Sequence, residues 1–98
     1  MEINKREEII ELYDIYGLLL TDKQRMYFEE YYFMDLSLQE IADNYEISKN
    51  GVFDQIKRTI HTLEIYEEKL MIRKKIEKIN SLNIADNIKE EILMIIKE

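Results

Sequence analysis

The chain of 98 residues contains no proline and only two glycines, Gly17 and Gly51. Proline and glycine make most of the tight turns between neighbouring strands, so a sheet built from this sequence would lack its connections. Residues with high helix propensity (Glu, Lys, Leu, Ile and Met) dominate instead. We therefore predict an all-α protein. Its length suits one domain with a modest core, or half of a dimer core.

Two helix starts lie close together near the middle of the chain. Ser37 is followed three residues later by Glu40, which is the spacing of a capping box, and Ser48 is a second N-cap candidate. About two helical turns fit between them. Apolar residues recur on one face of each helix: Leu38, Ile41, Ala42 and Tyr45 in the first, and Val52, Ile56 and Ile60 in the second.

This pattern predicts a helix-turn-helix motif at residues 37–60, with the turn at residues 45–47. The second helix of such a motif enters the DNA major groove. There Lys49 could approach guanine, Asn50 adenine and Phe53 a thymine methyl group, while Lys57 and Arg58 hold the backbone. Contact of Phe53 with a neighbouring helix or subunit is the alternative, and it applies equally to Asp54. The candidate DNA-binding residues are Ser48, Lys49, Asn50, Phe53, Asp54, Lys57 and Arg58.

The motif resembles a known family. SLQEIADNYEISKNGVFDQIKRT is similar to region 4 of the sigma-70 family, where an EIA segment, an I-S turn and a G-x-V-x3-I/L-x-R run recur. The wider run YGLLLTDKQRMYFEEYYFMDLSLQEIA, with YEEKL at residues 66–70, resembles the YlxM family more particularly. These small bacterial proteins are described as DNA-binding regulators and are encoded beside signal recognition particle genes. Members commonly carry an S-R-Q-A-V-Y-D-type run where this chain has SKNGVFD at residues 48–54.

The resemblance implies a sigma-70 region 4-like bundle with extra C-terminal helices in a segment-swapped dimer. It also implies a regulator that binds double-stranded DNA and takes part in the signal recognition particle pathway. The alternative is an interaction module that binds a protein or RNA component of that particle and does not bind DNA. Fold alone does not choose between these functions.

Charge argues against simple DNA binding, because the formal net charge of −7 repels phosphate. Its distribution weakens the objection. Residues 1–47 hold 12 acids and 4 bases, a net of −8, and residues 48–98 hold 9 acids and 10 bases, a net of +1. The second helix of the motif is therefore in the less acidic half.

The segments before the motif are expected to build the core. Gly17 should end a first helix, and Leu18-Leu19-Leu20 is expected to be a buried connector. Thr21 and Gln24 form a capping box for a helix that reaches about Met34. Its many aromatic residues could stack on single-stranded nucleic acid, but the local charge is negative, so we assign them to packing.

The apolar stripe shifts its face near residues 69–73, where we expect the helix to bend or to break. We therefore divide the chain into a helix-turn-helix domain at residues 1–70 and a C-terminal helical dimerisation appendage at residues 71–98. The basic run at residues 73–75, with Lys69 and Lys78, either contacts phosphate or forms a solvated face paired with Glu67, Glu68 and Glu77. A last helix from about Ala85 to Lys97 is apolar all round near its end and should dock on a second subunit.

No residue pattern indicates catalysis. There is no cysteine, His61 is the only histidine and is expected at the surface, and the two glycines cannot form a phosphate-cradling loop. We expect no enzyme, no cofactor and no metal site. The absence of cysteine and of any long apolar run predicts a cytoplasmic protein without a membrane span.

Overall fold

The structure is a computed structural model that describes residues 3–98. It is all-α over those residues, which confirms the predicted fold class. The elements in chain order are α1 (Ile3–Tyr16), the short 3-10 turn η1 (Gly17–Leu19), α2 (Asp22–Tyr32), α3 (Leu38–Tyr45), α4 (Lys49–Leu70), α5 (Ile72–Asn80) and α6 (Asp86–Lys97).

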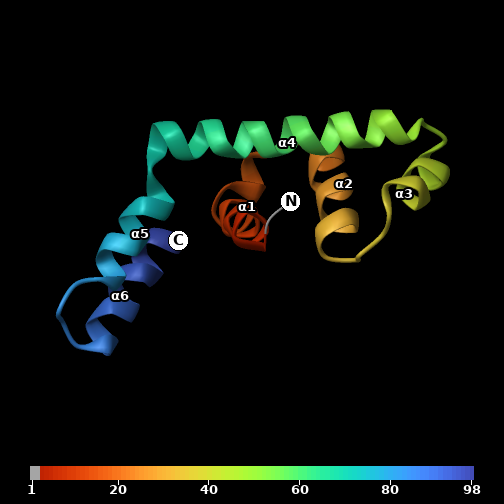
Figure 1. Ribbon diagram of the computed structural model, residues 1–98. Coiled ribbons are helices and arrows are strands. Elements are labelled where there is room, and N and C mark those ends of the chain that lie inside the picture. The colour runs from red at the N-terminus through yellow and green to blue at the C-terminus, as the bar shows by residue number, and fades with distance from the viewer. Residues whose placement is uncertain (1–2) are drawn as a thin grey trace.

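The helix α4 is the spine of the molecule (Figure 1). Helices α1, α2 and α3 pack along one side of it, and α5 turns away at its far end to form a hairpin with α6. The described chain measures 51 × 23 × 20 Å, with a radius of gyration of 15.9 Å. A compact domain of 100 residues has a radius of gyration of about 13 Å. The excess arises because the α5–α6 hairpin projects from the bundle.

The core lies between α4 and the three helices below it. Phe28 of α2 is fully buried and stacks on Tyr13 of α1, with ring centroids 4.2 Å apart. Tyr27 and Tyr32 of α2 are also buried, so the packing role predicted for the aromatic helix is confirmed for these residues. The other main core side chains are Ile9, Leu12, Tyr16, Ile41, Ala42, Val52, Ile56 and Leu63.

The connector after α1 was predicted incorrectly. Leu20 is buried, but Leu18 and Leu19 are 85% and 58% exposed. Gly17 ends α1 as expected and starts a 3-10 turn. Successive side chains in a 3-10 turn lie about 120° apart, so three adjacent leucines cannot all point into the core. Further along, the capping box of Thr21 and Gln24 is confirmed.

The junction between α4 and α5 is held by a buried tyrosine and a carboxylate. The helical conformation is interrupted at Met71, which adopts a left-handed conformation with φ of 57°. Tyr16 donates to Glu67 Oε1 at 2.7 Å and accepts from the Ile72 amide at 3.1 Å. Glu67 also accepts from the backbone amides of Arg73 and Lys74. Burial and the hydrogen bond to Glu67 raise the pKa of Tyr16 to about 12.

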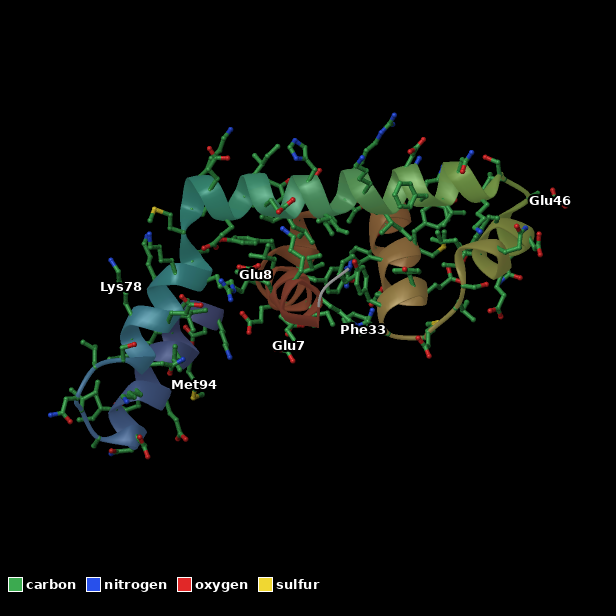
Figure 2. All side chains as sticks on the ribbon, viewed as in Figure 1. Glu7, Glu8, Phe33, Glu46, Lys78 and Met94 are labelled. Carbon is green, nitrogen blue, oxygen red and sulfur yellow. The ribbon has the colours of Figure 1, made fainter. Side chains whose placement is uncertain are left out.

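The helix break falls inside the predicted range of residues 69–73. Beyond it, α6 starts at Asp86, close to the expected Ala85, and leaves apolar side chains in solvent. Met94 and Ile95 are 67% and 69% exposed, and Figure 2 shows Met94 on the outside of the hairpin. Among the described residues, no helix is both long and apolar enough to cross a membrane.

Candidate nucleic-acid interface

The first helix of the predicted motif begins as its sequence indicates. Ser37 Oγ accepts from the Glu40 amide at 3.1 Å, and Glu40 Oε1 accepts from the Ser37 amide at 3.2 Å. These two bonds form a complete capping box at the start of α3. Ile41 and Ala42 are buried in the contact of α3 with the rest of the bundle. The small side chain of Ala42 allows the close crossing that the motif requires.

The turn between α3 and α4 depends on Glu46, which Figure 2 labels at the tip of the bundle. Glu46 has φ of 54° and ψ of 42°, and the amides of Glu46 and Ile47 both donate to the Ala42 carbonyl oxygen. A non-glycine residue in the left-handed region costs about 1 kcal/mol. The turn therefore occupies residues 46–48, one residue later than predicted, because Tyr45 still belongs to α3.

A hydrogen bond between a half-buried tyrosine and a buried glutamate fixes α3 on α2. Tyr45 of α3 donates to Glu30 Oε2 of α2 at 2.5 Å. Glu30 is only 9% exposed, so its carboxylate depends on this partner. The same bond, together with burial, raises the pKa of Tyr45 to about 12. Because α2 also packs on α4, the pair sets the position of α3 against the spine.

The start of α4 is capped by Ser48, as predicted. Its Oγ accepts from the Gly51 amide at 3.0 Å. A side chain at position 51 would place its Cβ 3.1 Å from that same oxygen, so Gly51 leaves room for the cap. Val52 and Ile56 then turn into the core and are at most 4% exposed. In the part of the chain that the structure describes, the side chains on the opposite face of these first turns are exposed.

The predicted site residues lie together on the free face of the first turns of α4. Each of them is exposed in the single chain. Phe53 is 51% exposed, which is high for a phenylalanine. Within residues 3–98, the cationic groups of Lys49, Lys57 and Arg58 form no ion pair. The residues are Ser48, Lys49, Asn50, Phe53, Asp54, Lys57 and Arg58.

Two hollows flank this face. One is apolar, encloses about 190 Å³ and is lined by Tyr31, Leu38, Phe53, Ile56, Lys57 and Ile60. The other is polar and open, with about 580 Å³, and is lined by Gln24, Asp54, Lys57, Arg58, His61 and Thr62. Lys57 stands between the two hollows.

Three lining residues of the polar hollow were missed as site candidates. Gln24 was interpreted only as a capping residue, and that role is confirmed by its bond to the Thr21 amide at 3.0 Å. His61 is exposed, as expected, one turn beyond Lys57. The helical repeat of four residues from Asp54 through Arg58 to Thr62 was the available signal for this edge of α4. The position of Gln24 beside it depends on the tertiary fold.

A sequence profile of the UPF0122 family, described as "Putative helix-turn-helix protein, YlxM / p13 like", matches residues 3–97. The chain is 46% identical over 96 residues to the UPF0122 protein YlxM of Bacillus subtilis strain 168, covering 93% of this chain and 87% of that protein. It is 50% identical over 84 residues to a UPF0122 protein of Thermoanaerobacter sp. strain X514, covering 86% of this chain and 70% of the relative.

A further relative is the UPF0122 protein of Lactococcus lactis subsp. cremoris strain MG1363, which is 53% identical over 70 residues. That match covers 71% of this chain and 63% of the relative. The profile and the relatives agree with the helix-turn-helix geometry of α3 and α4. The chain therefore belongs to the UPF0122 family of YlxM/p13-like helix-turn-helix proteins.

Proposed function

We propose that the chain is a DNA-binding regulatory protein that inserts the first turns of α4 into the major groove of double-stranded DNA. One observation carries this proposal. The start of α4 is capped, its inner face is buried, and its outer face presents exposed cations that have no ion-pair partner within residues 3–98. A helix held in this way needs no rearrangement before it can enter a groove.

The residues on the outer face suit base-edge and phosphate contacts. In this proposal Lys49 contacts guanine and Asn50 contacts adenine, while Lys57 and Arg58 contact phosphates. Phe53 offers an apolar surface to a thymine methyl group. Asp54 is the only acid among the candidates, and it would disfavour a phosphate placed close to it.

The active species in this proposal is a homodimer joined by residues 71–98. The support is the exposed apolar surface of α6, which includes Met94 and Ile95 and which a single chain leaves in water. A two-fold dimer would present two copies of α4 to a two-fold DNA site. A role in the signal recognition particle pathway follows only from the YlxM resemblance and is part of the proposal.

An interaction module that does not bind DNA is the second candidate. Two observations favour it: the net charge of −7 and the apolar hollow beside Phe53, which suits a protein helix better than a phosphate backbone. Under this alternative, the partner would be a protein or RNA component of the signal recognition particle system.

Fluorescence anisotropy of labelled duplexes across a salt series tests the proposal. We expect binding to random and own-promoter duplexes that weakens steeply with salt and falls in Lys49→Ala and Arg58→Ala. The matched control is Lys97→Ala, which removes one exposed positive charge from the end of α6. An RNA duplex is run in parallel. A flat signal for all DNA at low salt would reject the DNA-binding function and favour the interaction module.

A further inference from the structure

The most basic stretch of the chain lies outside the proposed DNA-reading surface. Residues 69–80 contain five bases against the single acid Glu77, a local net of +4 in a chain whose total is −7. Four of these bases are exposed lysines at the end of α4 and along α5, which we call the lysine face: Lys69, Lys74, Lys75 and Lys78.

Two of the three acids that could neutralise the lysine face are engaged with other groups, while the third, Glu68, is exposed and has no ion pair within residues 3–98. Glu67 is turned inward, where it accepts from Tyr16 and from the backbone amides of Arg73 and Lys74. Glu77 pairs with Arg73 at 3.2 Å. Arg73, the fifth base of the stretch, also pairs with Glu11 at 2.6 Å and Glu8 at 3.3 Å, so its charge is neutralised by acids of α1.

The lysines themselves have no ion pair in the part of the chain that the structure describes. Three of them, Lys74, Lys75 and Lys78, share one side of α5, because Lys74 and Lys78 are four residues apart and Lys75 and Lys78 are three apart. Like charges at these spacings destabilise a helix. Figure 2 shows Lys78 pointing away from the bundle, into solvent. A polyanion bound along this side would remove that repulsion.

We propose that the lysine face is a second nucleic-acid-binding surface that contacts the phosphate backbone without reading sequence. Lysine supplies compact point charges, which suit phosphate groups and do not discriminate bases. An anionic membrane is less suitable along α5, because its apolar residues Ile72, Ile76 and Ile79 are half-buried. Leu70 and Met71, at the end of α4, are 45% and 40% exposed and are the apolar side chains that this stretch could offer to a bilayer.

This surface is independent of the reading role proposed for α4. Figure 1 shows α5 turning away from the axis of α4, so the lysines of α5 do not continue along the line of the free face of α4. A straight duplex lying on one of them would not lie flat on the other. The lysine face would thus hold a second segment of nucleic acid, or a segment that bends round the end of α4. Both duplex DNA and duplex RNA carry the required phosphates.

The test uses anisotropy of random-sequence duplex DNA and duplex RNA with the full chain and the double variant Lys74→Gln, Lys78→Gln. Each lost phosphate contact reduces the slope of log K against log salt by about 0.9 on B-DNA. We therefore expect a weaker complex at low salt and a slope smaller by about 2. Lys74→Arg with Lys78→Arg should restore binding, since the charge is kept.

The matched control is Lys97→Gln, compared with the single variant Lys78→Gln, because it removes one exposed charge from α6 and should leave the affinity within about twofold. Lys57→Gln, Arg58→Gln separates the two proposals. If only this variant loses binding, the proposal for the lysine face is rejected and the function proposed for α4 stands. If only the α5 variant loses binding, the function proposed for α4 is rejected and the proposal for the lysine face stands. An α5 variant that loses affinity only for vesicles of anionic phospholipid, or for no polyanion at all, would also overturn the inference.

Discussion

Replacing Tyr45 with phenylalanine removes one oxygen atom and isolates the bond that positions α3. The ring contact with Tyr27, at a centroid distance of 5.3 Å, is kept in the variant. Only the hydrogen bond to Glu30 at 2.5 Å is lost. The carboxylate of Glu30, a residue that is only 9% exposed, is then left without a hydrogen-bond donor among the residues that the structure describes.

The expected cost follows from the charge of the acceptor. A hydrogen bond to an ionised group contributes about 1.5–3 kcal/mol, and an acceptor left buried without a donor adds to the loss. Tyr45 is half-buried, so water can reach part of the site. We therefore expect the free energy of unfolding to fall by about 2 kcal/mol. For a chain of this size each kcal/mol lowers the melting temperature by about 4–8 °C. The variant should therefore melt roughly 8–16 °C lower.

The assay is urea unfolding followed by far-ultraviolet circular dichroism, with thermal melting beside it. Tyr31→Phe is the matched control, because Tyr31 is also half-buried and its hydroxyl makes no hydrogen bond in the described chain. The free energy of unfolding of this control should lie within about 0.5 kcal/mol of that of the parent, as is usual for substitutions that remove no specific contact. Equal stabilities for the two variants would refute the reasoning that the Tyr45–Glu30 bond holds α3 in place.

Three further outcomes are expected. Ser48→Ala should lower the free energy of unfolding by about 1 kcal/mol, measured by urea titration, because the α4 cap is lost. The pKa of Tyr16 is raised to about 12, against about 10 in an unfolded chain, so the folded state keeps a proton that the unfolded state loses. Stability should thus fall as pH rises from about 10 to about 12, and Tyr16→Phe should reduce that fall without abolishing it, because the pKa values of Tyr32 and Tyr45 are also raised to about 12. A parent whose urea midpoint is constant up to pH 11 would contradict this. Met94→Lys with Ile95→Lys should convert a dimer to a monomer in sedimentation equilibrium, and a parent that is already monomeric would exclude the proposed dimer.

Local signals predicted much of this fold. The capping boxes at Thr21 and Ser37 and the cap at Ser48 depend on residues three apart, so their spacing is visible in the sequence. The shift of the apolar stripe near residues 69–73 likewise indicated the break at Met71. The candidate residues of α4 could be selected because the helical repeat assigns Val52 and Ile56 to the core and leaves the opposite side free.

Contacts between distant segments could not be predicted in this way. Arg73 pairs with Glu8 and Glu11, more than sixty residues earlier, and helical periodicity contains no information about such a pair. The expectation that the acids near α5 would pair with its lysines was wrong for Glu67, because that carboxylate caps the α5 backbone instead. Burial of all three leucines after Gly17 was wrong for a local reason, the geometry of the 3-10 turn.

Site-specific crosslinking tests the central claim most directly, since the chain has no cysteine and one introduced cysteine is a unique attachment site. A photo-crosslinker is attached at Asn50→Cys on α4 and, as a control, at Asp14→Cys on the exposed side of α1. The account predicts that the probe on α4 crosslinks duplex DNA and that methylation of guanine N7, which lies in the major groove, weakens the crosslink. Equal crosslinking from both positions, or none from position 50 while DNA is bound, would contradict it.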